Sequence, residues 1–259
     1  MMHSQTTWQE TVVLPVGYME EGNGKVHREA TLRKMTGNEE ALLADPKLRS
    51  NAGKLITALL GSCVTALEEV EKVNPAVIRR LTSADRNYLL LELRRLTFGD
   101  EMEAHYRCPR CQGVTAVIED LAALDVRRVE DGDTPAEIQV TLQDGYRDPD
   151  GHWQHELVFG LPTGEDEEAA GSRRDGNPSR QRDALLARCL KHVGDLESRR
   201  IQAMGIRILA ELSMADRRLI QKALDDAAPG PDLTRTVICD HCGEEYRTTL
   251  DMSHFFPLG

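Results

Sequence analysis

Two pairs of cysteines have the spacing of a metal-binding turn. Cys108 and Cys111 stand in "RCPRCQG", and Cys239 and Cys242 stand in "ICDHCGE". A Cys-x-x-Cys turn places two thiolates on one edge of a tetrahedron, and two such turns supply the four ligands of a structural zinc site. We therefore predict one zinc ion bound by all four thiolates. The alternative is that one or both pairs are surface thiols, because 127 residues separate Cys111 from Cys239.

Histidine ligands and thiol redox chemistry are the alternatives for the same turns. His105 and His241 lie near the cysteines, but a side chain inside such a turn usually points away from the metal, so we expect neither to bind zinc. Cys-x-x-Cys is also the redox motif of thioredoxin-like proteins, where it follows a strand and opens a helix. Here each pair lies between two strand-like segments, which favours a zinc knuckle and leaves a thiol-disulfide oxidoreductase as an alternative.

The rest of the sequence contains no catalytic constellation. It has no glycine-rich phosphate loop, no nucleophile elbow and no His-Glu-x-x-His motif. Cys63 and Cys189 fall on apolar helical stripes and are expected to be core thiols. The repeated Asp-Arg pairs at Asp85 and Asp216 stand at predicted helix starts, where capping and ion pairs between halves explain them. We therefore predict no catalytic and no cofactor-binding residues, and a protein that is not an enzyme.

The two cysteine pairs belong to a longer internal repeat. Residues 17–37 and 145–164 both open with Gly-Tyr and close with Thr-Gly, and "ALLGSC" at Cys63 is matched by "ALLARC" at Cys189. The matched landmarks keep their order, with an offset of 126 residues at these cysteines and 131 residues from Cys108 to Cys239. We predict two divergent tandem repeats, 1–130 and 131–259, whose pseudo-two-fold packing brings the cysteine turns together.

The hydrophobic periodicity predicts an α+β fold in each repeat. In the first repeat we expect strands at 10–16 and 24–33, helices at 47–72 and from Thr82 to Leu96, and strands at 101–107 and 114–118. In the second we expect strands at 136–142 and 153–159, helices at 179–193, 198–211 and 213–227, and strands at 233–238 and 245–250. Residues 164–181 are polar and acidic, and are predicted to be a mobile loop.

Composition limits the classes of partner. The 259 residues carry a formal net charge of -11, so the chain is a poor candidate for binding nucleic acid, which requires a positive surface. It has no run of 18 apolar residues and no secretory signal at its start, so we expect no membrane span and a cytoplasmic location. The apolar tail at 253–259 is expected to pack on the body in preference to a partner.

Several segments together resemble the T4-like phage baseplate protein family. They are "LPVGY", "REATLRKMTGNEE", "LTSADRNYLLLELRRLTFGDE" and "CPRCQG". The resemblance covers residues 12–125 well and the second half more loosely, through "LPTGEDEEA", "ALLARC" and "CDHCGE". It implies a non-enzymatic part in building the baseplate or hub of a phage tail or phage-tail-like contractile injection system, with other baseplate, hub or tail proteins as partners. The zinc prediction comes from the cysteine spacing and not from this resemblance.

Three classes of function follow, and a simple observation separates each. A structural or assembly protein of a contractile particle would copurify with tail components. A zinc-ribbon adaptor of another cytoplasmic assembly would have different genes beside its own. A thiol-disulfide oxidoreductase would cycle its dithiol with a thioredoxin system and hold no metal.

Overall fold

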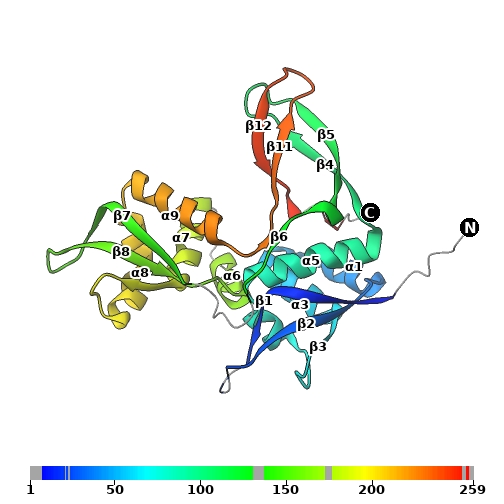
Figure 1. Cartoon of the computed structure of the whole chain (residues 1–259), viewed down its shortest axis with the longest axis horizontal. Helices are drawn as coiled ribbons and strands as arrows, with labels where there is room; N and C mark the ends of the chain where they lie inside the picture. Colours follow the sequence, from blue (N-terminus) through cyan, green and yellow to red (C-terminus); the bar gives the residue numbers. More distant parts are fainter. Residues whose placement is uncertain are drawn as a thin grey trace, which may run out of the picture.

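The computed structural model describes residues 8–20, 22, 24–130, 137–172, 177–252 and 255–256. It is a mixed α+β structure with two bodies along the long axis and an arm of two β-hairpins that projects above the first of them (Figure 1). Each of these three parts has its own hydrophobic cluster.

The first body is a small antiparallel sheet covered by helices. Its sheet has the order β1-β2-β3, with β1 at Gln9–Met19, β2 at Val26–Arg33 and β3 at Val64–Leu67. The long helix α5 (Ser83–Phe98) packs against β1 and β2. The remaining helices are α1 (Gly37–Ala44), α2 (Pro46–Arg49), α3 (Ala52–Cys63) and α4 (Pro75–Arg80). The predicted strands at 10–16 and 24–33 are confirmed.

A buried aspartate joins helix α5 to the sheet. The side chain of Thr82 caps α5 by accepting a hydrogen bond from the amide of Asp85. The carboxylate of Asp85, which is 0% exposed, accepts hydrogen bonds from the amides of Val16 and Gly17 at a bulge in β1. Gly17 has φ +99°, and a Cβ there would lie 2.7 Å from Val26, so the Gly-Tyr motif marks a backbone that only glycine adopts readily.

The second body has the same arrangement of sheet and helices. Its sheet has the order β7-β8-β9, with β7 at Ile138–Arg147, β8 at Trp153–Phe159 and β9 at Leu190–Val193. The helices are α6 (Gly164–Gly171), α7 (Pro178–Cys189), α8 (Ser198–Glu211) and α9 (Met214–Ala227), and α9 packs on β7 as α5 packs on β1.

The second body has the same contact between a buried aspartate at a helix start and the backbone amides of a strand bulge, which we call the aspartate clasp. Asp216, 0% exposed, accepts from the amides of Gln143 and Gly145 at the bulge of β7. Gly145 has φ +84°. The two bodies therefore share the order of strands in the sheet, the bulge in the first strand and the aspartate clasp, as two repeats would. An origin by duplication and a pseudo-two-fold axis between the halves stay predictions.

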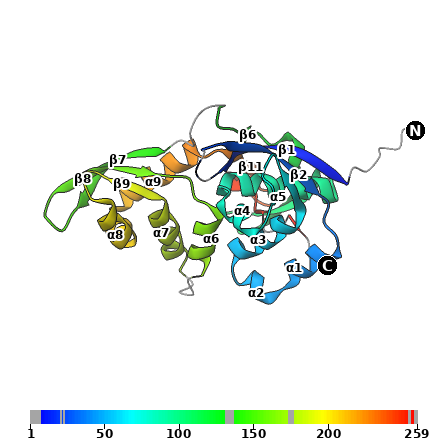
Figure 2. The same cartoon turned by 90° about the horizontal axis from the view of Figure 1, so that it is seen from below.

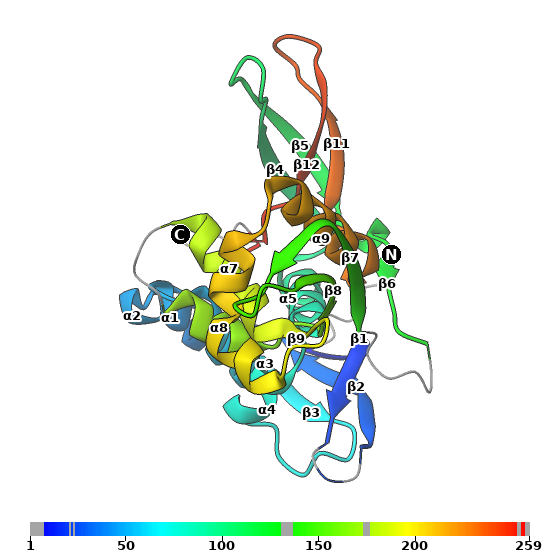
Figure 3. The same ribbon diagram turned by 90° about the vertical axis from the view of Figure 1, so that its left-hand side faces the viewer.

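Two hairpins form the arm. β4 (Glu101–Arg107) pairs with β5 (Val114–Asp120), and β11 (Thr234–Ile238) pairs with β12 (Glu245–Thr249). Alternate side chains face inward along each strand, as in a half-buried β-ribbon. The two hairpins lie side by side with their turns at the far end of the arm (Figure 3). Their shared core ends at Leu91 of α5 and at Phe255, which is fully buried, so the tail packs on the molecule at this residue.

The chain crosses between the bodies more than once. After β5 come the 3₁₀ turn η1 (Leu121–Ala123) and the short strand β6 (Val126–Arg127), which pairs with β10 (Gly230–Pro231). Helix α6 lies between the two bodies (Figure 2) and packs on α3 and α4 of the first body as well as on α7.

The predicted helices at 47–72 and 179–193 are wrong in their second parts, and the first is also interrupted at Ser50 and Asn51, between α2 and α3. In each case the helix ends at a cysteine, Cys63 or Cys189, and the chain continues as a four-residue strand, β3 or β9. These strands complete the three-stranded sheets, and the β-branched residues in "VTAL" favour this conformation. Tertiary pairing therefore overrides the apolar stripe that continues through this point in the sequence.

The predicted mobile loop at 164–181 is also wrong wherever the chain is described there. Residues 164–171 form α6, and α7 begins at Pro178; residues 173–176 lie outside the described residues. Thr163 and Asp166 form a capping box at the start of α6, and Asn177 caps α7. The acidic residues therefore favour the positive end of a helix. Across the described ranges, no helix is long and apolar enough to span a bilayer.

Candidate metal centre

The four predicted ligand residues meet at the far end of the arm. Cys108 and Cys111 come from the turn after β4, and Cys239 and Cys242 come from the turn after β11. Their four sulfur atoms all lie within 4.8 Å of one another. The structure therefore brings the two Cys-x-x-Cys pairs together across the chain, which sequence spacing alone could not establish.

The two turns have the same backbone geometry. The amide of Cys108 donates to the carbonyl of Gly113 at 2.9 Å, and the amide of Cys239 donates to the carbonyl of Glu244 at 2.8 Å. Gln112 has φ +62° and Gly243 has φ +70°, which places a left-handed residue right after the second cysteine of each pair. This conformation reverses the chain and points both thiols of each turn to the same side.

The sulfur spacing fits a tetrahedral thiolate site. The Sγ atoms of Cys108 and Cys242 are 3.8 Å apart, and those of Cys111 and Cys239 are 3.6 Å apart. Zinc bound at about 2.3 Å from each sulfur requires sulfur–sulfur edges of about 3.8 Å. A disulfide would require about 2.05 Å, and all six cysteines of the chain are free thiols. The arrangement can therefore hold one metal ion between the two hairpins.

Hydrogen bonds stabilise thiolate at one of these residues. Burial raises the pKa of Cys239, but the amides of His241 and Cys242 and the thiol of Cys111 donate to it and bring its pKa down to about 6. The amide of Glu244 lowers the pKa of Cys242, but burial and the hydrogen bonds with the other three sulfur atoms raise it to about 12, because the charged form is disfavoured beside a first thiolate. Four close sulfurs cannot all ionise without a cation, and a bound metal supplies that charge.

The two histidines near the turns do not face the sulfur atoms. The Nε2 atom of His241 lies 3.2 Å from the carbonyl oxygen of Val114, and its ring covers Gly113 on the opposite hairpin. His105 lies on the outer face of β4 with its Nε2 3.3 Å from Glu103. The described group with metal-ligand geometry consists of the four cysteines, as expected from the position of the histidines in the sequence.

A polar network below the sulfurs also joins the hairpins. The hydroxyl of Tyr106 donates to Glu119 at 2.6 Å, and Arg235 from β11 donates to the same carboxylate at 2.8 Å. Burial, followed by the nearby Glu119 carboxylate, raises the pKa of Tyr106. These residues were not predicted from the sequence. Glu119 stands at an inward position of β5, on the same face as Thr115 and Val117, and a charged residue at such a position signals a buried partner.

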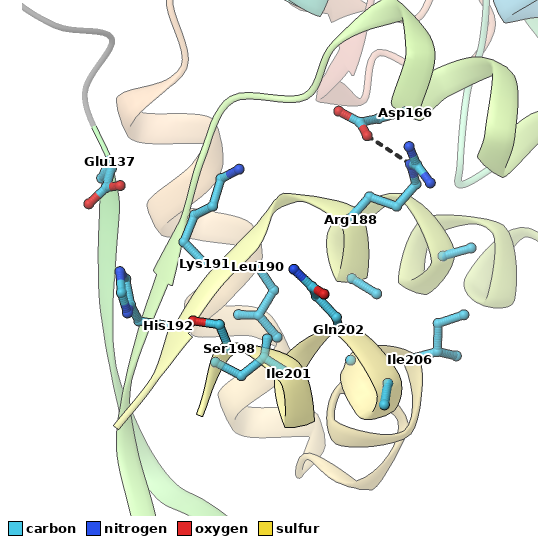
Figure 4. Close-up of a pocket in the computed structure, with 14 residues that line it drawn as sticks. Glu137, Asp166, Arg188, Leu190, Lys191, His192, Ser198, Ile201, Gln202 and Ile206 are labelled. Atoms are coloured by element: carbon cyan, nitrogen blue, oxygen red, sulfur yellow. Dashed lines mark hydrogen bonds and ion pairs between the residues drawn. The ribbon is translucent and has the colours of Figure 1, made fainter. Parts of the chain in front are cut away.

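An open cleft of about 650 Å³ lies on the second body between α7, β9 and α8 (Figure 4). Its lining mixes apolar side chains such as Ile201 with polar ones such as Gln202 and Lys191. The interaction drawn within it is the ion pair of Asp166 and Arg188, 2.7 Å long, which ties α6 to α7. This pair has a structural explanation, and the group with metal-ligand geometry among the described residues lies in the arm and not in this cleft.

A comparison with protein families shows the family of the chain. The model of the family described as T4 bacteriophage base plate protein matches residues 14–257. The chain belongs to the T4 bacteriophage base plate protein family. The match to this baseplate family spans both bodies and both cysteine hairpins, so the resemblance seen in the first half holds for most of the chain. Comparison of the baseplate protein with curated proteins and with solved structures gave no match.

Proposed function

We propose that this chain is a non-enzymatic structural or assembly protein of the baseplate or central hub of a phage tail or phage-tail-like contractile injection system. The observation that carries the proposal is the match to the baseplate family over residues 14–257. The partners are then other baseplate, hub or tail proteins. The protein is made in the cytoplasm and joins the particle there, and its net charge of -11 argues against a nucleic-acid partner.

The proposal includes one structural zinc ion bound by Cys108, Cys111, Cys239 and Cys242. All-thiolate ligation and sulfur edges of 3.6 and 3.8 Å support zinc over harder metals, which prefer oxygen ligands. Such a site exists only when the two hairpins are in contact, so metal binding contributes free energy to their association. Zinc would add to the shared hydrophobic cluster in holding together two sheets that have only two strands each.

The proposal also includes an origin by duplication, with repeats at 1–130 and 131–259. Three observations support it: the two sheets have the same order of strands, Asp85 and Asp216 form matching clasps, and each cysteine lies near a cysteine of the other turn. Cys108 approaches Cys242 while Cys111 approaches Cys239, which is the pairing that a local two-fold axis through the arm would produce. An experimental structure whose two bodies superpose with matched bulges would support this origin, and unrelated bulge positions would count against it.

Recovery of the chain from cells that assemble contractile tails tests the function. We expect an affinity-tagged chain to copurify with baseplate, hub or tail proteins in stoichiometric amounts. A chain that is uniformly monomeric in those cells, with no tail protein bound, would contradict the proposal. Recovery with a different cytoplasmic assembly would instead indicate a zinc-ribbon adaptor. The Cys108→Ser variant in the same experiment shows whether partner binding needs the metal.

A further inference from the structure

One of the contacts between the two bodies is made by the capped helix α6 on a surface of the first body. The start of α6 pairs with the start of α5: the amide of Gly164 donates to the carbonyl of Leu81 at 3.1 Å, and Thr163 bridges to Thr82. One helical turn later, Glu167 accepts from Arg86 at 3.0 Å and from Ser83. We call this part of the first body, formed by the first turns of α3 and α5 and the end of α4, the inner acceptor surface.

Arg86 organises that surface while fully buried. Its guanidinium donates to the carbonyls of Gly53 and Ile78 and to the hydroxyl of Thr57, and its Nε donates to Glu167. A buried arginine needs this many acceptors, because an unpaired charge in the interior is costly. The neighbouring Thr57 donates to Glu168 at 2.5 Å, so α6 supplies two successive carboxylates to the surface.

The second body has the same surface, built around Arg217. Its guanidinium donates to the carbonyl of Leu209 at 2.6 Å, to Asp183 at 2.6 Å and to the hydroxyl of Ser179. These three groups occupy the places of Ile78, Thr57 and Gly53 around Arg86. We call this region, formed by the first turns of α7 and α9 and the end of α8, the outer acceptor surface.

In contrast to the inner surface, the outer one is open. Met214, the counterpart of Ser83, is 68% exposed, and the Arg217 side chain is 18% exposed where that of Arg86 is 0% exposed. The Nε atom of Arg86 donates to Glu167, whereas the matching Nε atom of Arg217 has no hydrogen bond to any residue that the structure describes. A pocket of about 140 Å³ lies between α7 and α9 at this place.

The counterpart of α6 in the first body is α1, and its docking face is exposed. Both helices start with Thr-Gly and a capping box, at Thr36 and at Thr163. In α1 the positions that match the docking face of α6 are Gly37, Glu40, Ala41 and Ala44, and all four are exposed. Glu40 corresponds to Glu167, so it carries the carboxylate that Arg217 lacks.

One further difference between α1 and α6 matches a difference between the outer and inner acceptor surfaces. Where α6 presents Glu168 to Thr57, α1 presents Ala41, and the outer surface has Asp183 in place of Thr57. A glutamate at this position of α1 would have placed two carboxylates in contact, which is unfavourable. The alanine avoids this repulsion.

We propose that α1 of a second copy of this chain docks on the outer acceptor surface, as α6 docks on the inner one. α1 lies on the opposite side of the molecule from α7 and α8 along the long axis (Figure 2). The two patches of one chain are therefore apart, and the contact forms between two copies. The two patches differ, so the interface is heterologous and joins copies head to tail, into a ring or an open row. This inference goes beyond the baseplate role and does not depend on zinc.

The contact between copies is weaker than the contact within the chain. A Cβ at Gly53 would lie 2.7 Å from the amide nitrogen of Glu168, so glycine lets α6 approach closely. Ser179 has a side chain at the matching place, and Ala44 replaces Gly171, so α1 is held farther from its surface. Association therefore depends on protein concentration.

Two single substitutions with a mixing experiment test the proposal. Ala41→Glu alters only the docking helix and places a carboxylate against Asp183, and Met214→Glu places a carboxylate against Glu40 and alters only the outer surface. Sedimentation of the full chain up to about 1 mM is expected to show growth beyond the dimer for the wild type, and monomers for each variant. An equimolar mixture of the variants is expected to form a 1:1 dimer, because one intact helix meets one intact surface.

Two substitutions outside both patches serve as controls. Glu165→Arg changes an exposed first-turn acid of α6, and Ile118→Glu changes an exposed apolar residue of the arm; both should associate like the wild type. Unchanged metal content and thermal midpoint show that each variant is folded. A wild-type chain that stays monomeric, variants that still associate, or a mixture with no dimer would overturn the proposal. None of these results depends on binding of tail proteins, so they leave the proposed function untouched.

Discussion

The six cysteines fall into two chemical classes that their surroundings decide. Cys63 and Cys189 end matching helices in the two bodies, and burial raises the pKa of each to about 12. They remain thiols and act as small core side chains. Cys111 and Cys242 are exposed at the end of the arm, next to buried Cys108 and Cys239. The sequence already separated these classes, because the first two lie on apolar stripes and the other four lie in turns.

Alkylation of the native chain should follow this division. We expect none of the six thiols to react quickly while metal is bound, since a coordinated thiolate is protected. After chelation, iodoacetamide should modify Cys111 and Cys242 first, because they are exposed, and Cys63 and Cys189 only on unfolding, because they are buried thiols with a raised pKa. Peptide mapping by mass spectrometry gives the order. Rapid labelling of Cys63 in the folded chain would contradict it.

The two buried aspartates give a second prediction at the scale of single residues. Asp85→Ala or Asp216→Ala leaves backbone amides at a bulge without an acceptor, which should lower the free energy of unfolding by about 2–4 kcal/mol in each case. Asp144→Ala, at an exposed residue of the same bulge, is the matched control and should have little effect. Urea unfolding measures all three, and an unaffected Asp216→Ala would show that the second clasp carries no stability.

At the scale of elements, caps and hairpins were predictable from the sequence and the ends of helices were not. Thr82 caps α5 as its sequence indicates, and the strands around the cysteine turns are in place. The helix predicted over 47–72 stops at Cys63, because the chain pairs with β2 beyond that point. No local signal encodes this pairing. The short helix α6 was missed because polar composition outweighed its capping box.

The capping box of α1 contains a buried carboxylate that makes stability depend on pH. Hydrogen bonds from Arg33 hold the pKa of Glu39 well below its usual range, and Ser62 and Thr36 contribute to this shift. Because the pKa is lower in the folded state, the stabilisation is complete above the unfolded value of about 4.3 and is lost as the pH falls below it.

Replacement of the arginine tests this dependence. Arg33→Met should lower the free energy of unfolding by about 1–3 kcal/mol at pH 7, since the buried Glu39 carboxylate loses its charged partner. The difference from the wild type should narrow below about pH 4, because Glu39 of the unfolded chain becomes protonated there while the folded wild-type carboxylate does not. Arg200→Met removes a half-exposed ion pair with Asp150 and should change nothing measurable. Equal losses for both variants at all pH values would contradict the account.

At the scale of the whole molecule, three separate joins connect the two bodies. They are the docking of α6 around Arg86, the pairing of β6 with β10, and the shared core of the hairpins that ends in the four cysteines. Sequence spacing identified the four ligand residues but could not show that they meet, because 127 residues lie between Cys111 and Cys239. The fold closes that distance through contacts that no local pattern contains.

The predicted zinc ion connects the two repeats, because each repeat provides two of its four ligands. Loss of any one ligand should then release the metal, whichever half provides it. Cys108→Ser and Cys239→Ser are therefore expected to lose the ion and to lower the free energy of unfolding by similar amounts. Two independent sites, one in each half, would instead leave half of the metal in each variant.

Native mass spectrometry of the purified chain, with zinc counted per chain, is the most direct test of this central claim. The account predicts one zinc ion per wild-type chain and none in Cys108→Ser or Cys239→Ser. A metal-replete Cys239→Ser chain, zinc held between two chains, or a metal-free wild type with a reversible disulfide would contradict it.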